Sequence, residues 1–359
     1  MNMRKGNLII TMIILSLGLF IPSKCISIAS NMDDNIIAIF PLKNYSDDKT
    51  ALTTIYPLIE KKIEERNFSV LDAEILKRFL IENRVRDKGY VDRKIGKKLF
   101  EHYNVKAILT GSINTYYQGD NPQVGLSLRL IDSLTGSIRW AEHGSITNKD
   151  FRSIFGEVIK KDVNELSLIL INKLFNSLNV GNLHTKEKNP YRVGVMPLAN
   201  RTDRKNLGII ATHILIEKLF KERNIEPIEF GNTRNLIVNL KINQKGEIDL
   251  KSAINIAKAL NLDGIIVGSV ETLKYEPNID SAPEAEISAR LIDTNIGKII
   301  WSGFSHFRGD EKTIILDFGK IRSPEGVLAE ALSMIANDMG KSLIKRNNYT
   351  KYQVERLIP

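Results

Sequence analysis

The strongest constraint on the fold of this chain is that its sequence repeats. Leu126–Trp140, which reads LSLRLIDSLTGSIRW, matches Ile287–Trp301, ISARLIDTNIGKIIW, at eight of fifteen positions. Two further blocks recur in the same order, at spacings that drift only from 156 to 161 residues. They are Pro41 with Pro197 and Gly111 with Gly268. Because such recurrence marks a structural unit used more than once, the sequence predicts an internal duplication.

Each copy has the pattern of an α/β unit. An apolar strand opens it, and Ile55, Ile59 and Ile63 then recur at helical spacing. Three alternating strands and a closing helix follow. In the first copy we expect strands at 36–42, 68–72, 105–116, 123–132 and 137–147, and helices at 52–66, 73–84, 91–103 and 151–178. In the second we expect strands at 192–198, 225–230, 264–275, 284–293 and 298–308, and helices at 206–222, 232–240, 250–260 and 324–346.

The predicted fold class is therefore α/β, with two tandem copies of a unit whose mixed sheet is flanked by helices. A length of 359 residues agrees with about two domains. We expect the following boundaries: residues 36–178 for the first copy, 179–191 for a polar linker, 192–346 for the second copy and 347–359 for a polar tail.

The strand at 123–132 alternates in polarity. Its leucines lie on one face, and Ser127 and Arg129 lie on the other. This alternation predicts a half-buried strand with one face toward solvent.

The last hairpin of each copy carries a turn signal. Asp132 is followed four residues later by Gly136, and Asp293 by Gly297. Glycine takes the left-handed position of such a turn, so a turn-closing role for the two aspartates is favoured over a catalytic one. The tryptophan that comes next, Trp140 or Trp301, is interpreted as a core residue or as a partner-binding anchor, since tryptophan is enriched at interface hot spots.

The turn after the first strand argues against a nucleotide site. A phosphate-binding turn needs glycines so that backbone amides can approach the ligand. The segments PLKNYSD and PLANRTD contain none. Asn44 and Asn200 are expected instead to hydrogen-bond their own backbone, and the residue pairs 46–47 and 202–203 to cap the next element of the chain.

No other motif indicates catalysis, a cofactor or a metal. The histidines show neither HxxxH nor HExxH spacing, and no GxSxG or SxxK is present. We therefore expect a non-enzymatic protein with no catalytic, cofactor-binding or metal-binding residues. The histidines are His102, His143, His184, His213 and His306.

The first 29 residues resemble a secretory signal peptide. Arg4 and Lys5 precede a short apolar run, and small residues come after it. Cys25, the single cysteine, stands where a bacterial lipoprotein carries its lipidated cysteine, although Lys24 directly before it fits that pattern poorly. Three alternatives stay open: lipidation at Cys25, cleavage after Ala29 that leaves a mature chain without cysteine, or an uncleaved segment that acts as a membrane anchor.

The order of these blocks carries a family resemblance. The strand AIFPLKN, the segment ILTGS and the hairpin RLIDSLTGSIRW together resemble the curli-assembly and holdfast-attachment lipoprotein family (CsgG/HfaB-like). The same unit is similar to a periplasmic lipoprotein that activates a penicillin-binding protein and to the amino-terminal domain of TolB. The resemblance covers residues 36–178 and 192–346. The segments that would correspond to the curli channel's hairpins are too short to cross a bilayer and return.

The resemblance implies an exported cell-envelope protein, periplasmic or associated with the outer membrane or cell wall. It implies an assembly or secretion accessory that acts through contacts with envelope proteins or with copies of itself, and not with nucleic acid. The alternatives are a periplasmic module that docks on a cell-wall synthase, and an unrecognised hydrolase. A formal net charge of +9 does not choose among anionic partners.

We predict that the mature chain begins near Ser30, because small residues at 27 and 29 suit signal peptidase. Intact-mass measurement of the exported protein tests this. Retention of Met1 would contradict cleavage, and a diacylglycerol-sized excess on a chain that starts at Cys25 would indicate lipidation instead.

Overall fold

A computed structural model describes residues 35–86, 88–151, 158–178, 189–239, 250–275, 281–314 and 319–355, with side chains through residue 346. The predicted signal peptide, Cys25 and most of the predicted linker lie outside the described residues.

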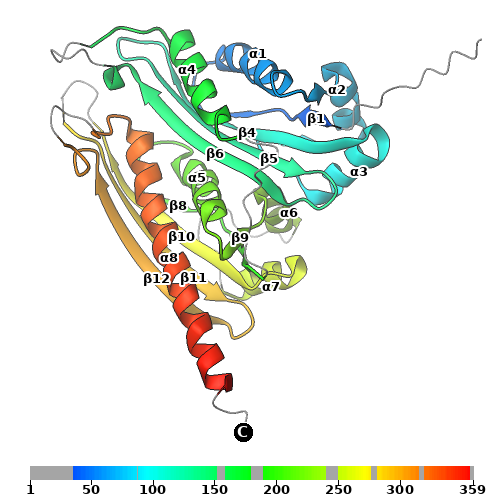
Figure 1. Cartoon of the computed structure of the whole chain (residues 1–359), viewed down its shortest axis with the longest axis vertical. Coiled ribbons are helices and arrows are strands. Elements are labelled where there is room, and N and C mark those ends of the chain that lie inside the picture. Colours follow the sequence, from blue (N-terminus) through cyan, green and yellow to red (C-terminus); the bar gives the residue numbers. More distant parts are fainter. Residues whose placement is uncertain are drawn as a thin grey trace, which may run out of the picture. The chain divides into compact units, whose positions relative to one another are not determined.

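The first half of the chain forms one mixed sheet with helices against it (Figure 1). Its strand order is β3-β1-β4-β5-β6, with β2 paired to β4. The strand β1 runs parallel to both of its neighbours, whereas β4, β5 and β6 form an antiparallel meander. The elements are β1 (Ile36–Ile39), β2 (Lys43–Asn44), α1 (Ala51–Glu64), β3 (Ser69–Val70), α2 (Ala73–Glu82), α3 (Arg93–Tyr103), β4 (Val105–Tyr117), β5 (Gln123–Asp132), β6 (Ile138–Thr147) and α4 (Val163–Phe175).

The second half has the same topology. Its sheet has the order β9-β7-β10-β11-β12, with β8 paired to β10, and its last three strands are again antiparallel. The elements are β7 (Tyr191–Val195), β8 (Ala199–Asn200), α5 (Leu207–Lys221), β9 (Ile225–Pro227), α6 (Phe230–Asn239), α7 (Leu250–Leu260), β10 (Gly264–Lys274), β11 (Glu284–Asp293), β12 (Lys298–Arg308) and α8 (Pro324–Glu355). The predicted α/β fold, in two similar units with mixed sheets, is confirmed.

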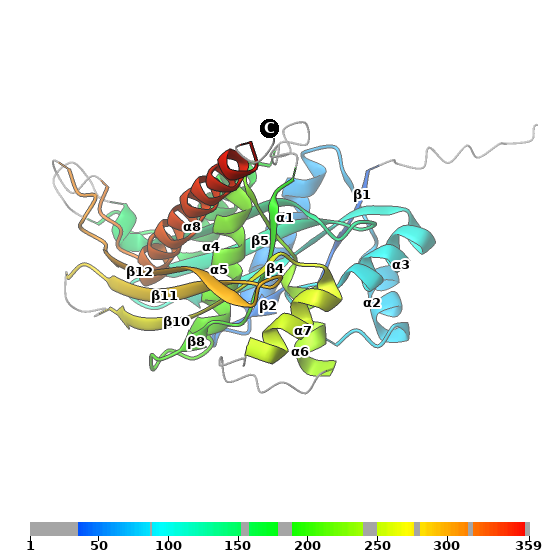
Figure 2. The same cartoon turned by 90° about the horizontal axis from the view of Figure 1, so that it is seen from below.

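In each half one sheet face is covered by the first and last helices. In the first half α1 and α4 pack side by side on this face. The isoleucines of α1 at positions 55, 59 and 63 are fully buried, whereas its other side faces solvent with Glu60 and Glu64. The helix is therefore amphipathic, as its spacing predicts. In the second half α5 and α8 take the same places (Figure 2).

The helix α5 differs from α1 because it packs between two sheets. It contacts β7, β9 and β10 of its own half and also β5 and β6 of the first half. Nearly all of its side chains are buried, and a helix that is apolar all round requires such surroundings. One core cluster consequently contains residues from both halves, including Ile138 and Ala141 of β6 with Ile216 and Phe220 of α5. Residues 34–359 form a single compact unit.

The prediction that β5 is half-buried is wrong. Both of its faces are buried along almost its whole length, because the second half covers the face that carries Ser127 and Arg129. Arg129 is only 1% exposed. Its guanidinium holds both carboxylate oxygens of Glu229, at 2.8 and 3.1 Å, and donates to the carbonyl oxygen of Gly89. This forked ion pair joins the two halves.

The predicted element bounds need correction in several places. The strands expected at 36–42 and 192–198 end at Ile39 and Val195, and a short separate strand, β2 or β8, follows a proline that has no amide proton to donate to the sheet. The strand expected at 225–230 ends at Pro227, and α6 begins at Phe230. The helix expected at 151–178 begins at Val163, where Asp162 accepts hydrogen bonds from the backbone amides of Asn164 and Glu165. The last helix continues beyond the expected end at 346, to Glu355.

The turn after the first strand is stabilised by its asparagine, as predicted. The Asn44 amide donates to the carbonyl oxygen of Asp48, and Asn200 donates equivalently to Arg204. The capping expectation is wrong, because neither pair 46–47 nor 202–203 caps a helix; α1 and α5 begin after residues 50 and 206 with no side-chain cap.

The hairpin turns also agree with the prediction. Asp132 accepts hydrogen bonds from the amides of Leu134 and Thr135, and Gly136 has φ +73°. Asp293 accepts from Asn295, and Gly297 has φ +65°. Both aspartates therefore hold a turn whose glycine adopts the left-handed conformation.

We predict that Arg129→Met destabilises the chain by about 3–5 kcal/mol, because it leaves the Glu229 carboxylate buried without its partner. The double variant Arg129→Met/Glu229→Leu should recover most of this loss, since it removes both charges. Equilibrium unfolding in urea measures both free energies. Arg290→Met is the matched control, because this arginine is the exposed counterpart of Arg129, and it should change stability by less than about 0.5 kcal/mol. Equal effects at the two arginines would contradict a structural role for the pair.

Candidate functional site

The same face of the two sheets has different surroundings in the two halves. In the first sheet this face carries Ser112, Ser127 and Arg129, which are all buried against the second half. The equivalent positions in the second sheet are Ser269, Ser288 and Arg290, as the repeated blocks align them. The covered face of the first sheet shows what this kind of surface binds.

The covered face contains a buried polar network centred on Glu325, near the start of α8. Its carboxylate accepts hydrogen bonds from the Asn114 amide at 2.6 Å and the Thr115 hydroxyl at 2.8 Å. His143 on β6 lies 3.6 Å from the same carboxylate. A side chain at Gly125 would collide with Glu325, because a Cβ there would lie 2.1 Å from its Oε2. The glycine therefore admits the carboxylate into the sheet face.

Burial shifts the pKa values of several groups in this interface. It raises the pKa of the Glu325 carboxyl and that of Glu217 on α5. It also holds the pKa of His143 and His213 well below the usual range for histidine, and the charge of Arg129 adds to the effect at His213. Both shifts favour the neutral form, as expected where water is excluded.

In the second sheet Ser269 on β10 is also buried, but the described residues leave the β12 side of the equivalent face exposed. Arg290 is exposed, and no partner for it exists among the described residues. Ile299 is 55% exposed, whereas its counterpart Ile138 is 8% exposed. Phe304 is 62% exposed and takes the place of the buried His143. We call Arg290, Ile299, Ser302 and Phe304 the open face.

The open face lies on paired strands with a fixed register. Arg290 stands opposite Ser302, Ser288 opposite Phe304, and Ile292 opposite Ile299. Because positions 288, 290 and 292 alternate on one side of β11, the four residues of the open face share that side of the sheet. Ser288 also donates to Glu271 at 2.6 Å, which anchors the adjoining strand. A rigid sheet thus presents an arginine between two exposed apolar side chains, a combination typical of protein interfaces.

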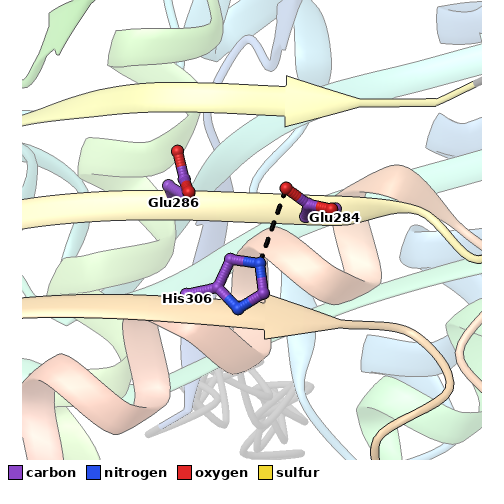
Figure 3. A group of neighbouring side chains, drawn as sticks. All are labelled: Glu284, Glu286 and His306. Carbon is purple, nitrogen blue, oxygen red and sulfur yellow. Dashed lines mark ion pairs between the residues drawn. The ribbon is translucent and has the colours of Figure 1, made fainter.

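A group of three possible metal ligands adjoins the open face. Glu284 and Glu286 project from β11 and His306 from β12, with one ligand atom of each within 4.8 Å of the others (Figure 3). Each of the three is already engaged. Lys274 lies 3.1 Å from Glu284, the Thr272 hydroxyl donates to Glu286, and His306 pairs with Glu284 at 3.5 Å. The hydrogen bond from Lys274 lowers the pKa of Glu284. The sequence prediction of no metal site stays a prediction.

Neither the open face nor this group is evident from motif spacing. The Glu-x-Glu pair places two carboxylates on one side of a strand, but the histidine comes from the neighbouring strand. Arg129 and Arg290 occupy the same position of the repeated block, so only tertiary packing makes one buried and the other exposed.

The two tryptophans proposed as partner contacts lie in the cores. Trp140 is 6% exposed, and its indole donates to the Ser177 hydroxyl at 2.9 Å. Trp301 is 8% exposed and donates to the Asp338 carboxylate at 2.9 Å. Trp140 therefore attaches its hairpin to the turn after α4, and Trp301 attaches its hairpin to α8, as the core interpretation expects. Their role in partner binding stays a prediction, as does lipidation of Cys25, which lies outside the described residues.

Comparison with known proteins gives structural likeness alone. No family model and no curated protein match the sequence. Lipoprotein GNA1162 from Neisseria meningitidis matches at 20% identity over 40% of this chain and 99% of its own length, with a TM-score of 0.29. The PelC dodecamer from Paraburkholderia phytofirmans matches at 18% identity over 41% of this chain and 84% of its own, also with a TM-score of 0.29.

TolB from Acinetobacter baumannii, a protein that the sequence resemblance includes, matches at 12% identity over 44% of this chain and 29% of its own, with a TM-score of 0.25. Each of these three matches covers less than half of the chain. The likeness to the curli-assembly family stays a prediction. Among the described helices, none combines the length and the apolar character needed to span a membrane.

We predict that His213→Leu makes stability less sensitive to acid. In the wild type, the unfolded chain binds a proton at this histidine below pH 6.5 and the folded chain does not. The contribution of the neutral His213 to the free energy of unfolding is therefore fully present above pH 6.5 and is lost as the pH falls. Below that pH, the free energy of unfolding of the variant should therefore fall by up to about 1.4 kcal/mol less per pH unit than that of the wild type. Urea unfolding at pH 7.5, 6.5 and 5.5 measures the difference.

His102→Leu provides the control for the substitution itself, because it removes an exposed imidazole from α3 and leaves the buried His213 in place. The buried Glu217 and Glu325 act in the opposite sense, because their raised pKa values favour the folded state as pH falls toward 4.5. Only the difference between variant and wild type is therefore diagnostic, and parallel curves for His213→Leu would contradict the prediction.

Proposed function

We propose that this chain is a non-enzymatic exported protein of the cell envelope, an assembly or secretion accessory that works through contacts with other proteins. The observation that carries the proposal is the difference between the two equivalent sheet faces. The first is closed by an apolar helix and a forked ion pair. The second exposes Arg290, Ile299 and Phe304, and no described residue pairs with the arginine.

The exposed residues of this face are of the kinds that protein partners bind. Isolated apolar residues are common on protein surfaces, but Ile299 and Phe304 flank an exposed arginine on one rigid face. Arginine and aromatic residues are enriched among residues that dominate binding energy. Export follows from the expected signal peptide, and the family resemblance supports a location in the periplasm or at the outer membrane.

The test is chemical crosslinking in intact cells, followed by purification of the chain and identification of the proteins bound to it. We expect secretion, appendage or outer-membrane components. Phe304→Ser should lower their recovery several-fold, because it removes the largest exposed apolar side chain of the open face. Ile81→Ser is the matched control: Ile81 is 68% exposed on α2, away from the open face, and its replacement should have no effect.

Two other outcomes would replace this proposal. Recovery of a cell-wall synthase alone would indicate a regulatory module that docks on that enzyme. Recovery of no protein, together with turnover in a panel of wall and glycan substrates, would indicate a hydrolase.

A further inference from the structure

We propose that the open face binds a helix of another envelope protein, and that this partner places a carboxylate on Arg290. The inference rests on the proposed function and specifies the chemistry of the partner. It is based on the covered face of the first sheet, which shows how this surface is occupied when an occupant is present.

Two features of the second half cover this face of the first sheet. The helix α5 lies across β5 and β6 and contributes buried apolar side chains such as Ile216 and Phe220. Glu229, directly before α6, supplies the carboxylate that accepts two hydrogen bonds from Arg129. An apolar helix and an acidic side chain beside it thus cover an arginine-bearing sheet.

The open face retains the feature that the carboxylate recognises. Arg290 occupies the position of Arg129, and Ser288 that of Ser127. Arginine binds carboxylates through two parallel hydrogen bonds, so an exposed arginine on a rigid strand is suited to a planar acidic group. Beside it the open face is more apolar at one position, where Phe304 replaces His143, and more polar at another, where Ser302 replaces Ala141. The exposed Ile299 and Phe304 give an apolar helix two side chains to pack against.

One difference restricts where the partner's acidic group lies. Gly125 admits Glu325 into the covered face, whereas Glu286 stands at the equivalent position of the second sheet. A carboxylate placed there would meet another carboxylate and would be repelled. The acidic group of the partner must therefore lie at Arg290, away from the end of the face that carries Glu286.

A second copy of this chain is a poor occupant. With Pro41 aligned on Pro197, Ile216 and Phe220 of α5 correspond to Glu60 and Glu64 of α1. Both glutamates are exposed, so α1 offers charged side chains where an apolar surface is needed. Burying both glutamates beside Ile299 and Phe304 would desolvate two carboxylates, and among the four residues of the open face only Arg290 carries an opposite charge. The structure thus favours a different protein as the partner.

The experiment places p-benzoylphenylalanine at position 304 of the full chain and irradiates intact cells. Mass spectrometry then identifies the crosslinked peptide. We expect a peptide from another envelope protein, from a segment with apolar residues at helical spacing and an aspartate or glutamate beside it. Arg290→Glu should reduce the crosslink about tenfold or more, since it sets like charges against each other, and reversal of the partner's acidic residue to arginine should restore it.

Arg78→Glu is the matched control for the charge reversal, because Arg78 is exposed on α2 and should leave the crosslink unchanged. Arg290→Glu should also leave the melting temperature unchanged, which separates loss of binding from loss of folding. Crosslinking to α1 of another copy, or a crosslink insensitive to Arg290→Glu, would overturn the inference. If general crosslinking recovers an envelope partner and position 304 does not, the inference fails while the proposed function stands. If neither recovers a protein, both fail.

Discussion

The forked ion pair between Arg129 and Glu229 determines how the two halves of this protein fit together. Both side chains are almost fully removed from water, and removal of one partner would leave the other charge buried and unpaired. The pair therefore holds the second half to the first sheet at this point. In the same interface α5 lies across β5 and β6, and its apolar sequence is explained by that position.

This arrangement makes the two similar units unequal. The interface covers a sheet face of the first unit and a helix face of the second, so each unit loses a different surface. The surfaces left exposed are the sheet face of the second unit, with Arg290 and Phe304, and the charged outer side of α1. One surface thus occurs in a closed and an open copy within the same chain. The closed copy stabilises the chain, and the open copy is the one that we propose for a partner.

The sequence is a good guide where short-range chemistry decides the structure. The period-two and helical apolar patterns locate the strands and helices, and the aspartate and glycine of each hairpin turn behave as their types require. It is a poor guide where an element begins or where a neighbour is distant in sequence. The closing helix of the first half begins at Val163 because Asp162 caps it, which apolar spacing alone does not reveal. The alternation of β5 indicates a solvent-facing side, and the second half covers that side.

The sequence by itself determines that this chain is built from two α/β units with the same order of elements. Repeated blocks and local turn chemistry carry that information, and both are contained within short segments. Only the tertiary structure decides which copy of the shared arginine is buried. Arg129 and Arg290 stand in nearly the same local sequence, and their surroundings depend on a carboxylate one hundred residues away from the first and on its absence, among the described residues, beside the second. Burial is a property of long-range packing, so similar local segments acquire different roles.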